Sequence, residues 1–375
     1  MKISKNIRVL LLISMVTLLL SMGCSNLTEP IKIGVVGTMT GINSDLSVSG
    51  RRGIELAVSE LNNSGGLQGR KVELVVKDDQ NDPMLALKVD KEFVDQNIPV
   101  VIGHYTSGMM LSSIDYLREK NLLILAPTVS ADSLSGLDDN FIRFIATTRE
   151  QAVVLADRAK KNNHKNFAVI YDLSNKAFND DLYNNFQRLL EQDQGRIVLT
   201  QTFTSHIDLD GASIVNKVAA SKADALFIMA NAEDNAQISQ QLRKIGCDVQ
   251  TYSPLWSNTD ELIKKGGTAV EGAFLVGAID INDRANSFVK FKEDYIQKYG
   301  DNPTFSSVYS YETAVALFQA MKMGPNLNPA TLKKNIIKIR DFKGLQRDFQ
   351  IDKFGDNVRA YHMLRIQNGE LRKVD

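Results

Sequence analysis

Short apolar runs alternate with amphipathic segments along the chain from Ile31 onward. Residues 31–36 predict a strand, and apolar side chains between Ile54 and Leu61 then recur at the i, i+3, i+4, i+7 spacing of a helix face. Residues 72–76 predict the next strand. Uninterrupted apolar strands that alternate with helices are typical of a parallel sheet with helices on both faces, so the pattern predicts an α/β fold.

Two later stretches, residues 99–110 and 122–130, share an arrangement that points to a site. Each begins with an apolar run and stops at Gly, Thr, Ser or Pro residues, as expected of two buried strands with polar loops at their carboxyl ends. Ligands gather at that edge of a parallel sheet, and the start of a helix, as at Ser107, suits a carboxylate. The alternative is that Ser107 is only a helix cap and Ser130 only a turn residue. The occurrence of two such loops on neighbouring strands favours the site.

After residues 141–145 the alternation starts again, which predicts a second doubly wound unit. Its expected strands are residues 166–171, 196–203, 223–229, 250–254 and 272–276, with a helix at 233–245. Three helical patterns follow at residues 287–299, 308–323 and 329–337. In the tail, residues 349–352 and 360–366 flank a Gly-Asp-Asn turn and predict a hairpin.

Length, charge and motifs exclude several classes of function. The 375 residues predict about two domains, and the 44 basic and 44 acidic side chains leave no net charge for a nucleic-acid surface. The histidines His104, His164, His206 and His362 are scattered and match no metal or catalytic motif, so neither a metal nor a cofactor is expected. His104 lies near Ser107, but no orienting acid is evident, and we expect a structural histidine instead of a catalytic base.

The first residues indicate export from the cytoplasm. A basic start at Lys2, Lys5 and Arg8 precedes an uncharged apolar stretch over residues 9–20, too short for a comfortable membrane span of ~20 residues. Cys24 follows Gly23 and resembles the lipid-modified cysteine of a bacterial lipobox, which predicts a signal peptide at 1–23 and a linker at 24–30. An ordinary signal peptide or an uncleaved anchor is the alternative. In each case the folded part faces the outside of the inner membrane.

An ordered series of motifs runs through the chain. They are IKIGVVGTMTG, GRRGIELAVSELNNSGGLQGRKVELVVKDDQNDP, VVIGHYTSG, LILAPTVSADSL, IYDLSNKAFNDDL, GGTAVEG and YSYETA. Together they resemble the periplasmic binding proteins of the branched-chain amino-acid (Leu/Ile/Val) family. The resemblance implies the type I fold, two doubly wound parallel-sheet lobes joined by a hinge that the chain crosses near Ile145, Val276 and Phe342. The N-terminal lobe would comprise residues 31–145 and 277–342, and the C-terminal lobe 146–276 and 343–375.

The resemblance also implies a ligand-binding site between the lobes. The carboxylate of the ligand would bind Ser107, Thr128 and Ser130, and Tyr105 would either form a wall of the pocket or serve only in packing. The family's tyrosines are replaced by three residues of this chain, Leu46, Phe178 and Asn231.

Where the family has an acid for the ligand's ammonium, this chain has Leu255 and Trp256, and Trp256 offers either a stacking face or ordinary core. Glu233 and Asp234 are candidates to replace the acid, and the alternative is that they only serve a helix N-terminus. These departures leave open a larger or aromatic amino acid and an aromatic or apolar carboxylate without an amine.

The expected function is a lipid-anchored solute-binding protein of the cell envelope that delivers its ligand to an ABC importer. The alternative is a sensor or envelope regulatory receptor with the same fold, which would report to a signalling protein. An enzyme is the third hypothesis, and the absence of catalytic motifs in the sequence speaks against it.

Overall fold

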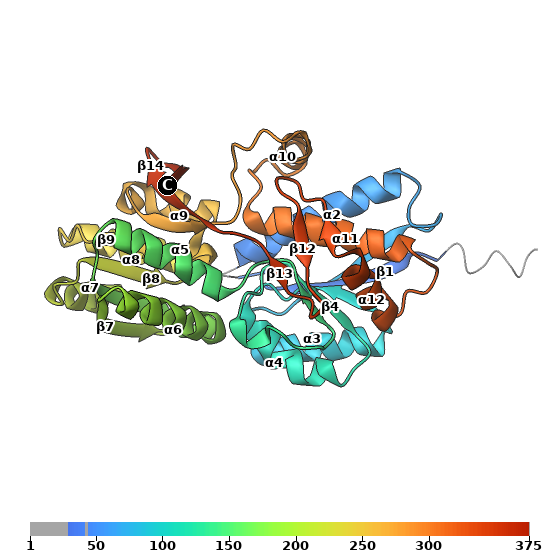
Figure 1. Cartoon of the computed structure of the whole chain (residues 1–375), viewed down its shortest axis with the longest axis horizontal. Coiled ribbons are helices and arrows are strands. Elements are labelled where there is room, and N and C mark those ends of the chain that lie inside the picture. Colours follow the sequence, from blue (N-terminus) through green and yellow to red (C-terminus); the bar gives the residue numbers. More distant parts are fainter. Residues whose placement is uncertain (1–28, 42–43, 375) are drawn as a thin grey trace, which may run out of the picture.

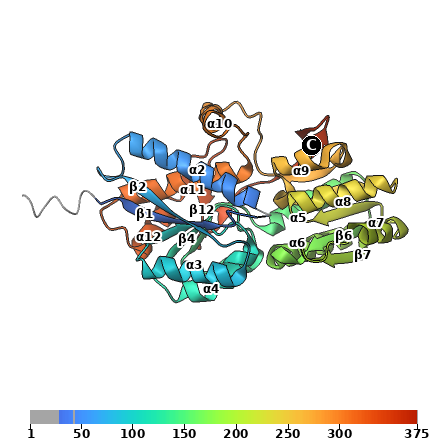
Figure 2. The same cartoon turned by 180° about the vertical axis from the view of Figure 1, so that it is seen from behind.

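The computed structural model of the protein describes residues 29–41 and 44–374. The predicted signal peptide and Cys24, the predicted lipidation site, lie outside the described residues. Two lobes lie side by side along the long axis of the molecule (Figure 1), and the view from behind shows the same division (Figure 2). Within residues 29–41 and 44–374, no helix has both the length and the apolar character needed to cross a bilayer.

The first lobe contains a five-stranded parallel sheet in the order β2-β1-β3-β4-β5. Its strands are β1 (Ile31–Gly37), β2 (Val72–Asp78), β3 (Val100–Ile102), β4 (Leu123–Ala126) and β5 (Phe141–Arg143). Side chains alternate between the two faces of a strand, so Val35 and Val36 of β1 enter different cores. Both faces are therefore buried, which explains the uninterrupted apolar runs in the sequence.

Helices cover both faces of this sheet. They are α2 (Ser44–Asn63), α11 (Phe305–Lys322) and α12 (Pro329–Ile339) on one face, and α3 (Pro83–Asp95) and α4 (Ser107–Arg118) on the other. Helix α10 (Asn286–Tyr299) packs against α2. Asp82 caps α3, since its carboxylate accepts hydrogen bonds from the N–H groups of Met84 and Leu85.

The second lobe repeats the same strand order, β7-β6-β8-β9-β10, in a parallel sheet that two antiparallel strands extend. Its parallel strands are β6 (Asn166–Asp172), β7 (Arg196–Phe203), β8 (Ala225–Met229), β9 (Gln250–Ser253) and β10 (Phe274–Gly277). Helices α5 (Thr148–Lys161) and α6 (Lys176–Gln192) cover one face, and α7 (Gly211–Ala220) and α8 (Ala232–Lys244) cover the other. The predicted class, two doubly wound α/β lobes, is confirmed.

The predicted tail hairpin is wrong. Strand β12 (Phe349–Ile351) pairs with β11 (Asp341–Phe342) and β13 (Asn357–Val358), whereas β14 (His362–Gln367) pairs with β10 and β15 (Glu370–Val374). Turn residues in the sequence marked the position of a reversal, but they did not specify which strands pair across it. The tail therefore contributes to two different sheets.

The small β11-β12-β13 sheet packs on the first lobe. Phe342, Phe349 and Ile351 lie in the same core as the first sheet, and the Phe349 ring contacts that of Phe144 edge to face, with centroids 5.9 Å apart. Tyr361, by contrast, belongs to a core cluster that contains residues of both lobes, and β14, which follows it, pairs with β10 of the second lobe. We therefore propose that the third crossing lies between β13 and β14, later than the position predicted near Phe342.

Candidate ligand-binding site

A small cavity of about 20 Å³ lies between the lobes. Its walls come from the loops after β3 and β4, from the starts of α2, α5, α6 and α11, and from the 3-10 turns Leu173–Asn175 and Leu255–Ser257. The lining residues are Leu46, Tyr105, Thr106, Ser107, Thr128, Ser130, Ile145, Gln151, Asn175, Phe178, Leu255, Trp256 and Phe305. A volume of this size holds about one water molecule, so a larger ligand requires the lobes or their side chains to move apart.

Seven residues that the sequence singled out are brought together here: Leu46, Tyr105, Ser107, Thr128, Ser130, Phe178 and Trp256. Asn231 does not line the cavity. Its side chain caps α8, accepting a hydrogen bond from the Asp234 N–H (2.9 Å) and donating to the Asp234 carboxylate (2.5 Å). The structure thus gives Asn231 a local capping role.

Two polar loops of the first lobe form one wall and are tied to each other. The Thr128 hydroxyl donates to the Tyr105 carbonyl (2.6 Å), and the Ser107 hydroxyl accepts from the Ala131 N–H (3.2 Å). Both bonds fix the loop after β3 against the loop after β4. Thr106 also lines the cavity, and its buried hydroxyl has no hydrogen-bond partner among the described residues. Because such a group costs free energy when left alone, it favours a polar ligand atom at this wall.

The N-terminus of α4 faces the second lobe. The first N–H groups of a helix have no partner inside the helix, and the side chain of Thr106, at the N-cap, satisfies none of them. The Gly108 N–H instead donates to Oδ1 of Asn175 in the second lobe, at 3.1 Å. A ligand carboxylate at this position would compete with the Asn175 amide for that donor.

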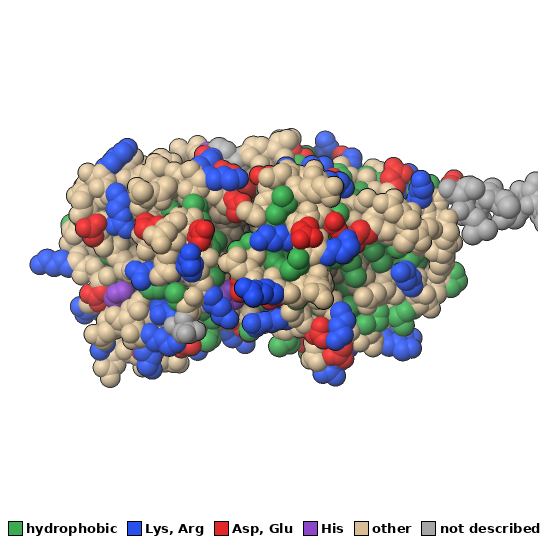
Figure 3. Space-filling model, turned by 90° about the horizontal axis from the view of Figure 1, so that it is seen from above, with side chains coloured by type: hydrophobic (Ala, Val, Ile, Leu, Met, Phe, Trp, Pro, Cys, Tyr) green, Lys and Arg blue, Asp and Glu red, His purple; other side chains and the backbone are tan. Residues whose placement is uncertain are grey.

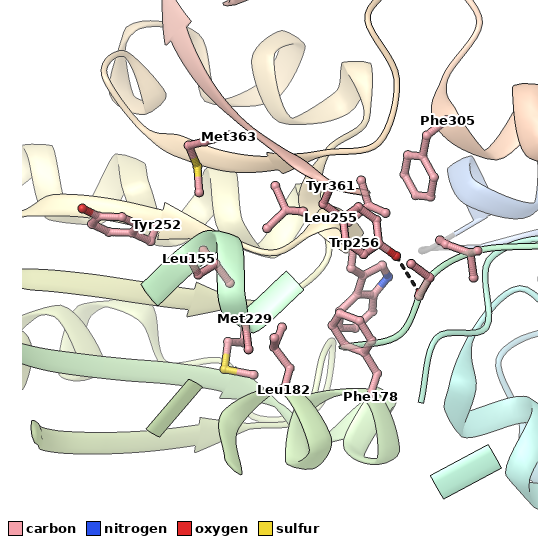
Figure 4. Packing of buried hydrophobic residues seen from close by; sticks show 14 of the residues in the cluster. Leu155, Phe178, Leu182, Met229, Tyr252, Leu255, Trp256, Phe305, Tyr361 and Met363 are labelled. Carbon is pink, nitrogen blue, oxygen red and sulfur yellow. Dashed lines mark hydrogen bonds between the residues drawn. The ribbon is translucent and has the colours of Figure 1, made fainter. Parts of the chain in front are cut away.

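The opposite wall is aromatic. Phe178 and Trp256 meet edge to face, with ring centroids 6.1 Å apart (Figure 4). Phe305, which comes from the first lobe, is labelled in the same view. Trp256 belongs to the hydrophobic core and also lines the cavity. Aromatic rings in this arrangement suit a flat or apolar ligand body.

The ring of Tyr105 explains why a glycine, Gly50, stands in the facing helix α2. A Cβ atom on Gly50 of α2 would lie 2.1 Å from a ring carbon of Tyr105, so only glycine leaves room for the ring. The Tyr105 hydroxyl lies 3.2 Å from that of Ser310, and burial raises the pKa of Tyr105. The ring is held in place and stays neutral at physiological pH.

Among the described residues, none that lines the cavity carries a charged side chain. Glu233 pairs with Lys265 at 2.8 Å, and buried Asp234 accepts a hydrogen bond from the Ser205 hydroxyl at 2.6 Å. Neither Glu233 nor Asp234 is among the residues that line the cavity.

His104 lies behind the binding loop, fully buried between two acids. Its Nδ1 is 2.9 Å from Asp79 and its Nε2 is 3.0 Å from Asp90, so the expectation that no acid orients it is wrong. Burial alone disfavours the charged ring, but the charges and hydrogen bonds of Asp90 and Asp79 together raise the pKa of His104 to about 10. Both ring nitrogens are committed to carboxylates, which leaves none to act as a base for Ser107.

Direct hydrogen bonds join the lobes around the cavity. The Thr259 hydroxyl donates to Asp45 (2.6 Å), and the Asn185 amide donates to Asp132 (2.8 Å). At the hinge, the Tyr361 hydroxyl donates to the Ala146 carbonyl (2.7 Å). The structure is therefore the closed form of the two lobes.

Sequence reasoning missed several lining residues, among them Thr106, Gln151, Asn175 and Phe305. Asn175 and Phe305 lie in or beside the motifs IYDLSNKAFNDDL and YSYETA, where their position at the starts of α6 and α11 was the available signal. Gln151 accepts a hydrogen bond from the Leu255 N–H at 3.1 Å, a contact that no local pattern indicates.

Two doubly wound lobes with a cavity between them are the architecture of a two-lobed binding protein. Consistent with this, the chain belongs to the periplasmic binding protein family, whose model matches residues 30–370. This is a family of binding proteins and not of enzymes.

Relatives of known sequence agree with this assignment. The chain is 28% identical over 253 residues to a Leu/Ile/Val-binding protein homolog of Brucella melitensis, covering 67% of this chain and 68% of that protein. A homolog of Brucella abortus is 24% identical over 364 residues, covering 94% of both chains.

Solved structures share the fold. A leucine-binding protein of Thermotoga maritima superposes with a TM-score of 0.85 at 24% identity, covering 92% of this chain and 98% of that one. A solute-binding protein of an ABC transporter from R. palustris, solved in complex with benzoate, gives 0.84 at 18% identity, covering 92% and 96%. At these identities the structures support the fold alone.

Proposed function

We propose that the protein is an extracytoplasmic solute-binding lipoprotein that captures a carboxylate between its lobes and delivers it to an ABC importer. The observation that carries this proposal is the composition of the cavity: hydroxyls and the N-terminus of α4 on one side, and the Phe178–Trp256 pair on the other. Lipidation of Cys24 would hold the protein at the membrane, with residues 24–30 as the tether.

The favoured ligand is an aromatic or apolar carboxylate without an amine beside its carboxylate. An α-ammonium would need an acid or several acceptors nearby, and no acid lines the cavity. Related proteins described as Leu/Ile/Val-binding, and the related structure with benzoate, support a small carboxylate as the general class. The aromatic wall supports a ring in particular.

Binding would follow opening and closure of the hinge. In the closed form the Asn175 side-chain oxygen accepts a hydrogen bond from the Gly108 N–H, and the cavity has a volume of about 20 Å³, so ligand entry requires separation of the lobes. On closure, the ligand carboxylate replaces Asn175 at the start of α4 and the ring packs against Trp256. The closed complex is the form that an importer would receive.

The test is thermal unfolding of a soluble form that starts after Cys24, screened against aromatic carboxylates, aliphatic carboxylates and amino acids. Ligand at about 100 times its Kd stabilises the protein by about 2.7 kcal/mol, a rise of a few degrees in Tm. Trp256 is the single tryptophan, so its fluorescence should change with the same ligand, and Ser107→Ala should weaken binding. If no compound shifts the Tm of folded, ligand-free protein, the transport proposal fails and the receptor alternative replaces it.

A further inference from the structure

A second and much larger cavity of about 590 Å³ opens beside the candidate site. Its walls come from α9 (Asp260–Gly266) and the residues before it, from the loops at either end of α10, and from the β14-β15 hairpin. Figure 3 views the molecule from above, the side on which Figure 1 places α9, α10 and β14. We call this cavity the hinge groove, because Ile279, Asp280 and Ile281 of the second crossing form part of its wall.

The hinge groove and the candidate site share one wall. Phe305, the first residue of α11, lines both cavities. On the second lobe, Leu255 and Trp256 line the small cavity, and Asn258 and Thr259 of the same segment line the groove. A change in the Phe305 side chain would therefore join the two cavities into one elongated space.

The groove is polar, and most of its charged groups are already paired or solvated. Asp280 accepts a hydrogen bond from the Asn282 N–H (2.9 Å), and Lys292 donates to the Ile281 carbonyl (2.9 Å). Glu370 pairs with Arg372 at 2.9 Å. Lys373 is exposed to solvent.

Asp260 differs from these groups. Across the described parts of the chain, no side chain forms a hydrogen bond or an ion pair with its partly buried carboxylate. Burial raises the pKa of Asp260, and the charge of Lys264 opposes this while those of Asp301 and Glu261 add to it. A partly desolvated carboxylate without a partner is stabilised by a cation or a hydrogen-bond donor supplied from outside.

We propose that the hinge groove is a second compartment of the binding site, in which Asp260 receives a cationic end of an elongated ligand whose carboxylate binds at the start of α4. This inference rests on the proposed function and specifies its ligand further: a carboxylate with an apolar body and an ammonium remote from the carboxylate. Phe305 lies between the two compartments and contacts the middle of such a ligand.

The chemistry of the two compartments is complementary. The small cavity offers hydroxyls, the Gly108 N–H and aromatic rings, which suit an anion and an apolar body. The groove offers an unpaired carboxylate and ample volume, which suit a cation and a chain of variable length. A ligand with charges at both ends would satisfy both compartments, whereas an α-amino acid would place its ammonium where no acid lies.

The experiment uses two matched series of para-substituted benzoates, in the soluble form that starts after Cys24. One series carries aminoalkyl chains of one to three carbons, and the other carries alkyl chains of the same length. Affinities are measured by calorimetry and by Trp256 fluorescence. We expect the ammonium compound of at least one length to bind about tenfold more tightly than its alkyl partner.

Asp260→Asn should abolish this advantage, and unsubstituted benzoate, which does not reach the groove, should still bind the variant and so show that it is folded. The matched control is Asp248→Asn, which changes the net charge equally at a carboxylate of 92% exposure in the same lobe and should keep the advantage. If alkylbenzoates bind but no ammonium compound binds better, or if the advantage survives in Asp260→Asn, the second compartment is refuted. If neither series binds, the proposed carboxylate-binding function fails first.

Discussion

The buried His104 between Asp79 and Asp90 allows one prediction to be worked out in detail. The perturbation is His104→Asn, which removes the donor from both carboxylates. Asp79 keeps hydrogen bonds from the Thr38 hydroxyl (2.8 Å) and the Asn81 N–H (3.0 Å). Asp90 has no comparable second donor. Among the described side chains, His104 is its one hydrogen-bond donor, and the other carboxylate oxygen of Asp90 has no partner.

The expected cost follows from that asymmetry. Leaving a buried charge without its partner typically costs about 3–5 kcal/mol, and Asp90 would be in that situation. We therefore expect His104→Asn to lower the free energy of unfolding by about 3–5 kcal/mol in urea denaturation. His206→Asn, at an exposed histidine, is the control and should cost less than about 0.5 kcal/mol.

The pH dependence has a defined sign. The pKa of His104 in the folded protein, about 10, lies above its ordinary value of 6.5. Its contribution to stability is thus complete below pH 6.5 and is lost as the pH rises toward 10. At the acid end, burial raises the pKa of Asp79, but the hydrogen bond and the charge of His104 lower it by more, so its pKa lies below the ordinary value of 3.8. The contribution of Asp79 to stability is therefore present above pH 3.8 and is lost as the pH falls below it.

The double variant His104→Asn/Asp90→Asn tests the reasoning most directly. Removing the stranded carboxylate should recover part of the stability that His104→Asn loses. Because both variants lack the imidazole, both should lose less stability than the wild type between pH 6.5 and 10. A His104→Asn protein within about 1 kcal/mol of wild type would refute the argument, and so would a double variant less stable than the single one.

Two further predictions concern the site's supports. Gly50→Ala should destabilise the protein by about 1–3 kcal/mol in thermal denaturation, because the added Cβ would overlap the Tyr105 ring. Gly324→Ala is the control, because a Cβ at Gly324 would meet open space, and equal effects of the two substitutions would contradict the packing argument. Thr259→Val should destabilise the closed form by about 1.5–3 kcal/mol, because the Thr259 hydroxyl donates a hydrogen bond to partly buried Asp45, and small-angle scattering should show a more open protein. Thr268→Val, at an exposed threonine, is the control, and an unchanged scattering profile for Thr259→Val would contradict the assigned contact.

The sequence predicted the layered fold well because burial of both sheet faces produces uninterrupted apolar strands. It placed the reversal in the tail but not the pairing, since the partners of β12 and β14 are chosen by contacts far apart in the chain. The same limit applies to His104: Asp79 and Asp90 reach it from β2 and α3, and neither lies in a motif with it.

The candidate site was predictable in part for a related reason. Ser107, Thr128 and Ser130 follow strands whose ends must meet at one edge of a sheet, so their convergence can be read from the chain. Asn175 and Phe305 approach from opposite lobes only after closure, a contact between two bodies that no local pattern encodes. Asn231 caps α8 in the structure, and a helix cap and a ligand contact at the same strand end have the same appearance in sequence.

The path of the tail has a consequence for how the protein is made. Phe349 and Ile351 complete the core of the first lobe, and β14 completes the sheet of the second, so both lobes depend on segments close to the C-terminus. A ribosome must therefore synthesise nearly the whole chain before either lobe can finish folding. Late completion delays the folding of both lobes until most of the chain has been synthesised, which suits a polypeptide that crosses a membrane before it folds.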